Sequence, residues 1–109
     1  MKLFKLFVFV PVKDAYKIRK VLADNDSGHI GNYDSCSFSV KGIGRFRPLE
    51  GAKPSIGEQG KIEEVEEERI EVIVTEDKLK KLLQAVIEAH PYEEPAIDIY
   101  PLANDEYLK

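Results

Sequence analysis

The chain has 109 residues, 43% hydrophobic and 33% charged, with a formal net charge of −4 and a sequence pI near 5.2. This profile is typical of one soluble globular domain, which we place over residues 1–109, and it excludes a disordered chain. The acidic balance argues against a nucleic-acid partner, and no apolar run reaches the roughly 18 residues of a membrane span. Cys36 is the only cysteine, so we expect no intramolecular disulfide and a cytoplasmic setting.

The first half of the sequence predicts a strand, a helix and a second strand. Residues 2–10, KLFKLFVFV, are rich in strand-forming side chains. Apolar residues recur at helical spacing over 13–26, and Gly28 stands where a helix-terminating glycine is favoured. Residues 33–47 alternate with period two, which predicts a long strand with Cys36 as a small buried side chain.

The second half predicts a strand, a helix and a short final strand. A polar loop rich in Gly and Pro, residues 48–60, leads into a strand over 61–74. Thr75 is a favourable N-cap for an amphipathic helix over 76–90. Residues 96–102 form the last strand, and the remaining residues form a frayed or docking tail.

The order strand, helix, strand, strand, helix, strand predicts an α+β fold, the ferredoxin-like βαββαβ sandwich. Its four-stranded antiparallel sheet would carry two helices on one face, with the first and third strands in the centre. The middle two strands would form a long hairpin arm around 41–68. Because Lys41, Arg45 and Arg47 then face Glu63–Glu68, we interpret the acidic run as a charge-matched hairpin rather than an acidic ligand site.

The arm also carries candidate binding residues. Its Gly-rich stretches lack the strand–loop–helix context of a phosphate-binding motif. Arg45, Arg47 and Lys53 nevertheless place positive charge on a long arm. We predict that these three residues bind a small anion or a protein partner.

The stretch HPYEEP, residues 90–95, joins the second helix to the last strand and has two interpretations. In the structural one, Pro91 and Pro95 bracket a rigid corner, and Tyr92 packs its ring while its hydroxyl finds a hydrogen-bond partner.

In the functional interpretation of this corner, Glu93 and Glu94 supply oxygen ligands and His90 or His29 supplies nitrogen to a divalent metal ion. The sequence has no HxxxH or CxxC spacing, which argues against a strong zinc site. A weakly bound divalent metal is therefore the one cofactor that the sequence suggests. No nucleophile is paired with a base, so we predict no catalytic residues.

Two long segments carry a resemblance to a known family. Residues 28–73, beginning GHIGNYDSCSF, and residues 85–102, AVIEAHPYEEPAIDIYPL, resemble the inserted domain of the NGG-interacting-factor-three-like family, and the match runs from about Val8 to Leu102. HPYEEP is also similar to a turn of the CutA cation-tolerance proteins. Both resemblances imply a ferredoxin-like domain related to the PII signalling proteins.

The resemblance implies that full-length members hold a two-metal centre in a flanking domain. This chain has two histidines, His29 and His90, and we expect it to be the insert alone, without hydrolase-like or cyclohydrolase-like activity. The function we predict is a non-catalytic, oligomeric binding or regulatory module with an unknown protein or small-molecule ligand. The alternative is a divalent-metal-binding protein of the CutA type.

The first strand predicts self-association, because both of its faces are apolar. Phe4, Leu6, Val8 and Val10 share one face, and Leu3, Phe7 and Phe9 share the other. Two helices on one side of a sheet cover only one of these sets. We therefore expect a homo-oligomer. The CutA resemblance implies a trimer, and a homodimer also satisfies the argument.

Overall fold

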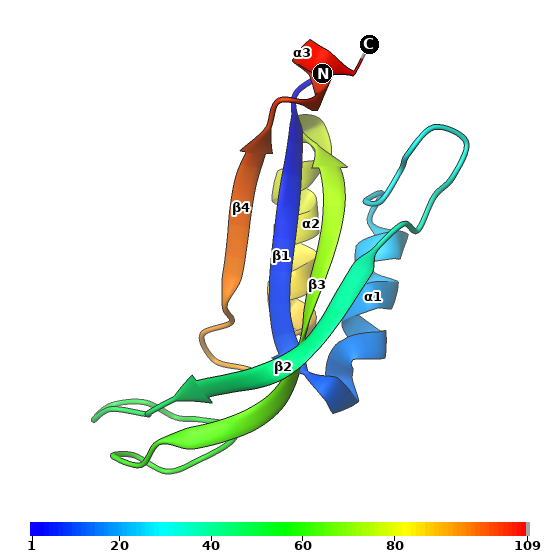
Figure 1. The fold of residues 1–109 in the computed structure, drawn as a ribbon. Coiled ribbons are helices and arrows are strands. Elements are labelled where there is room, and N and C mark those ends of the chain that lie inside the picture. Colours follow the sequence, from blue (N-terminus) through cyan, green and yellow to red (C-terminus); the bar gives the residue numbers. More distant parts are fainter. Residues whose placement is uncertain (109) are drawn as a thin grey trace.

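The computed structural model describes residues 1–108 and contains the predicted four-stranded antiparallel sheet (Figure 1). The strands lie in the order β2-β3-β1-β4, so the first and third strands are central, as predicted. The elements are β1 Leu3–Pro11, η1 Val12–Asp14, α1 Ala15–Asp24, β2 Phe38–Phe46, β3 Glu63–Thr75, α2 Glu76–Ala89, β4 Ile97–Leu102 and α3 Asn104–Tyr107. The short helix α3 lies in the predicted tail, where Asp105 pairs with the amino terminus at 3.4 Å.

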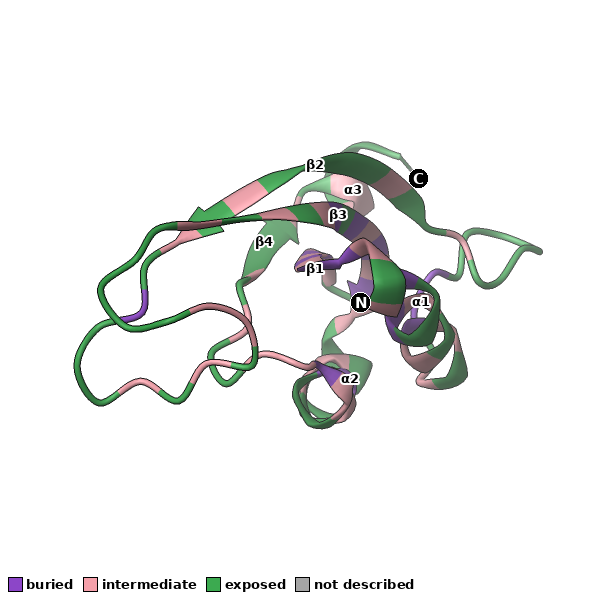
Figure 2. Cartoon of the chain, turned by 90° about the horizontal axis from the view of Figure 1, so that it is seen from below, coloured by how far each residue is buried: buried purple, intermediate pink, exposed green. Residues whose placement is uncertain are grey.

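The core lies between the sheet and two helices, α1 and α2, that cover the same face (Figure 2). From β1 it takes Leu6, Val8 and Val10, which are fully buried, while Phe4 packs at its edge. The helices supply their apolar stripes, which include Ile18 and Leu82. Because apolar side chains recur on one side of each helix, burial of these stripes stabilises helix and sheet together.

Helices α1 and α2 leave the opposite face of the sheet uncovered (Figure 2). The register places Phe7 beside Glu71 of β3 and Asp98 of β4, and its ring lies 4.8 Å from that of Tyr100. Phe38 of the edge strand β2 belongs to the same row and is 62% exposed. The helices therefore cover the set of β1 that contains Leu6, Val8 and Val10, and the other set faces outwards, a choice that the sequence left open.

The hairpin arm is formed by the far ends of β2 and β3. Strand β3 pairs with β1 only as far as Glu67, and beyond that residue it pairs with β2 alone. The arm makes the molecule elongated, with extents of 50 × 22 × 22 Å. Arg45 and Glu64 form an ion pair of 2.7 Å across the arm, as the charge-matched hairpin predicts. Glu68 differs, because it is buried and pairs with Arg19 of α1.

Two predicted details of residues 26–37 are wrong. The second strand begins at Phe38, and Cys36 lies before it, partly exposed, in a loop. Helix α1 ends at Asp24, so Gly28 does not terminate it. Gly28 has a φ of 80°, donates its N–H to the carbonyl of Ile73 at 2.7 Å and accepts the N–H of Cys36 at 3.0 Å. A Cβ there would lie 2.5 Å from the Cys36 carbonyl oxygen, so glycine is needed for close approach.

No helix among residues 1–108 is long and apolar enough to cross a membrane.

Candidate functional site

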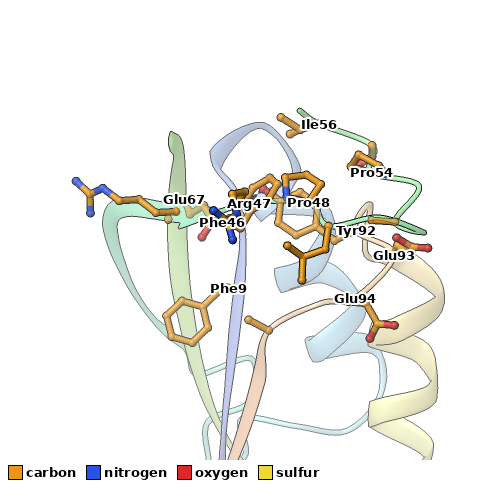
Figure 3. A pocket seen from close by; sticks show the side chains of 16 residues that line it. Phe9, Phe46, Arg47, Pro48, Pro54, Ile56, Glu67, Tyr92, Glu93 and Glu94 are labelled. Atoms are coloured by element: carbon orange, nitrogen blue, oxygen red, sulfur yellow. Dashed lines mark hydrogen bonds between the residues drawn. The ribbon is translucent and has the colours of Figure 1, made fainter. Parts of the chain in front are cut away.

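A hollow lies between the arm and the HPYEEP corner, and we call it the arm pocket (Figure 3). Its volume is about 580 Å³, within the range of small-molecule sites. Most of its lining is apolar and comes from β1, the arm, the loop over residues 48–60 at the tip of the arm (the arm loop) and the corner. The main apolar side chains are Phe9, Phe46, Pro48, Pro54, Ile56 and Tyr92.

The arm loop curls back towards the corner and forms part of the pocket wall. Its own ends are tied by the Gly60 N–H, which donates to the Pro48 carbonyl at 2.7 Å. Its middle is tied to the corner by the Lys53 N–H, which donates to the Glu93 carboxylate at 3.1 Å. Figure 3 shows Pro54 on this loop next to Glu93 of the corner. Two segments 40 residues apart in sequence thereby form opposite walls of one hollow.

His90 anchors the corner to the sheet. The residue is 7% exposed, and its Nε2 lies 2.7 Å from the Phe9 carbonyl oxygen. Its Nδ1 accepts the Tyr92 N–H at 3.1 Å. A carbonyl can only accept and an N–H can only donate, so the proton lies on Nε2 and both nitrogens are used. His90 therefore holds the corner in place and has no lone pair free for a metal ion or a substrate proton.

Tyr92 lines the corner side of the arm pocket and contacts the arm. Its ring packs edge-on against Phe46 with centroids 5.7 Å apart, and its hydroxyl donates to the Glu67 carboxylate at 2.9 Å. Burial, followed by this hydrogen bond, raises the pKa of Tyr92 well above that of a free tyrosine. The side chain therefore remains a neutral phenol that donates to Glu67 throughout the ordinary pH range.

Charged groups of both signs line the arm pocket. Arg45 and Arg47 belong to the arm, and Glu67, Glu93 and Glu94 to β3 and the corner. The third residue predicted for binding, Lys53, contributes its backbone N–H to the corner, while its side chain does not line the hollow. The structure thus brings two of the three predicted binding residues to one pocket.

The four predicted metal ligands are not brought together. Glu93 and Glu94 line the arm pocket, His90 is occupied by its two hydrogen bonds, and His29 is exposed in the loop after α1. His29 instead lines a small hollow of about 260 Å³ with Asp26 and Lys78. Among residues 1–108 no group of three or more His, Cys, Asp or Glu side chains is placed to hold a metal ion.

Sequence reasoning missed four apolar residues of the pocket, Phe9, Phe46, Pro54 and Ile56. Phe46 and Phe9 were assigned to strands, and Pro54 and Ile56 to a polar loop. A usable signal was present in the loop, since Pro54 and Ile56 are apolar residues within a Gly-rich stretch. An apolar residue in a long surface loop needs a surface to pack on, and here that surface is the corner.

The architecture defines the class of protein as a PII/CutA-like, ferredoxin-like α+β domain, as predicted. A solved structure with the same fold is the divalent cation tolerance protein CutA1 from Thermus thermophilus. It is 26% identical with a TM-score of 0.68, over 97% of this chain and 91% of that one.

A more specific likeness is to NIF3-related proteins. A Bacillus cereus protein related to NIF3 is 48% identical with a TM-score of 0.83, over 94% of this chain and 26% of that one. The GTP cyclohydrolase 1 type 2 homolog of Halalkalibacterium halodurans is 53% identical over 103 residues, 94% of this chain and 28% of that protein. The chain matches no family model. The predicted resemblance is confirmed, and the chain spans about a quarter of these relatives' length.

Proposed function

We propose that this chain is a non-catalytic binding module whose ligand site is the arm pocket. The observation that carries the proposal is the union, in one hollow of about 580 Å³, of the two segments singled out from sequence, the arm and HPYEEP. A mostly apolar hollow with a few convergent polar groups is the usual form of a small-molecule site.

The non-catalytic part of the proposal is supported by His90. Both of its nitrogens are occupied by backbone groups of the fold, so it does not serve as a general base. The proposal concerns this segment only and assigns to it none of the activity in the name of the relatives, of which it spans 28% in one case. We expect the module to work in the cytoplasm, where a partly exposed free thiol such as Cys36 stays reduced.

Titration with a small neutral aromatic compound, 2-phenylethanol, tests the proposed site by NMR. We expect amide shifts to concentrate at Phe9, Phe46 and Tyr92, which come from three separate segments. Ile56→Ala removes part of the pocket wall and should weaken binding several-fold. Ile62→Ala is the matched control, because Ile62 is also on the arm but is 70% exposed and outside the pocket. Shifts confined to other surfaces, or equal losses in both variants, would contradict the site.

The module also self-associates through the uncovered face of its sheet, with a second copy of the chain as the partner. Phe7 and Tyr100 pack together there, Phe38 and Tyr100 are 62% and 55% exposed, and Arg69 and Glu71 form an ion pair of 3.1 Å on the same face. Burying an exposed Phe side chain contributes about 1.5–3 kcal/mol. The mixed charges let two copies of one surface meet with opposite charges facing each other, as symmetric interfaces require.

Light scattering behind a sizing column measures this association directly. We expect a mass well above the 12.4 kDa of one chain. A trimer is the assembly we expect first, and a dimer is the alternative closed assembly. Phe7→Asp should yield a folded monomer. Tyr16→Asp introduces the same charge at an aromatic residue of α1 that is 74% exposed, and it should leave the mass unchanged. A monomeric wild-type protein at micromolar concentration would refute the proposed interface.

A further inference from the structure

The arm pocket contains more negative than positive charge, once its existing partners are considered. Arg45 is engaged by Glu64, which lies outside the lining, at 2.7 Å. Arg47 is then the one guanidinium of the lining without an ion pair among residues 1–108, and the lining also contains three carboxylates. The Glu67 carboxylate accepts a hydrogen bond from the Tyr92 hydroxyl, and the Glu93 carboxylate accepts one from the Lys53 N–H. Because both donors are neutral, these hydrogen bonds leave the two negative charges uncompensated.

The apolar walls suit a cation as well. Phe46 and Tyr92 line the pocket as an edge-to-face pair, and Phe9 lines it from β1. The face of an aromatic ring attracts a cation, and this attraction grows when the cation is partly removed from water. Glu93 and Glu94 follow Tyr92 in the sequence, and their carboxylates lie on the corner side of the hollow (Figure 3). Aromatic rings and carboxylates together select an ammonium or guanidinium group.

We infer that the arm pocket binds a small organic cation, an ammonium or guanidinium group carried on an apolar body. The inference rests on the proposed function and specifies the ligand class for the same site. It also departs from the sequence-based expectation of an anion, because Arg45 is paired within the arm and the Lys53 side chain lies outside the lining. The volume of about 580 Å³ accommodates a body of one or two rings.

Three compounds that share one phenyl ring and differ in charge test this inference. They are 2-phenylethylamine, 2-phenylethanol and 3-phenylpropionate, each titrated into the wild-type chain by calorimetry and NMR. A cation–π contact and a half-exposed ion pair together should make the amine bind about 10-fold more tightly than the alcohol. The propionate should bind more weakly than the alcohol, and salt should narrow these differences.

Charge-removing variants identify the groups responsible. Glu94→Gln should weaken amine binding about 3-fold and leave the alcohol unaffected, while Glu88→Gln, on the exposed side of α2, should change neither. Arg47→Gln should have the opposite effect and should tighten amine binding, because it removes a positive charge from the lining. Thermal melts of each variant establish that it is folded.

The outcomes separate the inference from the proposed function. If the alcohol binds in the arm pocket but the amine shows no preference, or the propionate binds most tightly, the cation inference is overturned and the binding module stands. If none of the three compounds shifts Phe46 or Tyr92, the proposed site itself is overturned. Amine binding that Glu88→Gln weakens as much as Glu94→Gln would also refute the inference, because the attraction would then be a general effect of negative charge.

Discussion

Replacement of His90 by alanine should cost about 2–4 kcal/mol of folding free energy, although the residue lies in a connection between helix and strand. The ring is buried and bridges the Phe9 carbonyl and the Tyr92 N–H. Its loss removes two hydrogen bonds of about 1 kcal/mol each and leaves two backbone groups without their partner, at about 1–3 kcal/mol each when they stay dry. Entry of water into the space lowers the total to the range given.

Urea unfolding at one fixed pH and protein concentration measures this cost, because association would otherwise shift the midpoint. His29→Ala is the matched control, since His29 is exposed and should change stability by less than about 0.5 kcal/mol. His90→Gln places an amide donor near the Phe9 carbonyl and should recover about half of the loss. If His90→Ala unfolds at the same urea concentration as His29→Ala, the bridge does not stabilise the corner and the reasoning fails.

Two further predictions concern Gly28 and Tyr92. Gly28→Ala should lower the melting temperature clearly more than Gly31→Ala. Both glycines have positive φ, but only a Cβ at residue 28 would collide, at 2.5 Å from the Cys36 carbonyl oxygen. Equal losses in the two variants would refute this close approach. The pKa of Tyr92 is raised in the folded chain. Above pH 10.0, the ordinary pKa of tyrosine, the unfolded chain loses the phenol proton while the folded chain keeps it, so the free energy of unfolding falls as pH rises. Tyr92→Phe should lack this contribution, so the stability difference from wild type should shrink above pH 10; a constant difference would mean that Tyr92 is not shielded.

The order of elements could be predicted because each carries a strong local signal. The apolar stripe that includes Leu82 and Val86 specifies α2. The alternation in β1 defines two apolar faces without choosing between them, and the structure buries the face of Leu6, Val8 and Val10. The cross-strand pair Arg45–Glu64 followed from antiparallel pairing alone. These features depend on spacing within a segment, which sequence reveals directly.

Residues 33–37 show where a local signal misleads. Their alternation of serine with larger residues has the period of a strand, but these side chains are small or polar and gain little from burial. The backbone there instead follows the contact between Gly28 and Cys36 and the positive φ of Ser35. Such a loop is determined by distant backbone hydrogen bonds, which leave no periodic trace in the sequence.

The arm pocket could not be predicted for a related reason. It depends on the arm loop folding back on the corner, where Lys53 meets Glu93 across 40 residues of chain. Sequence reasoning named charged residues on both sides of the hollow without placing them together. It also left His90 with two interpretations, part of a rigid corner or a metal ligand, and the hydrogen bonds to Phe9 and Tyr92 match the first.

A crystal structure of the chain soaked with 2-phenylethylamine would test the central claim, ligand binding in the arm pocket, most directly. The account predicts density for the ring against Phe46 and Tyr92, with the amine nitrogen within about 4 Å of the carboxylate of Glu93 or Glu94. The claim would be contradicted if the amine bound only on another surface and protein side chains filled the space between the arm and the corner.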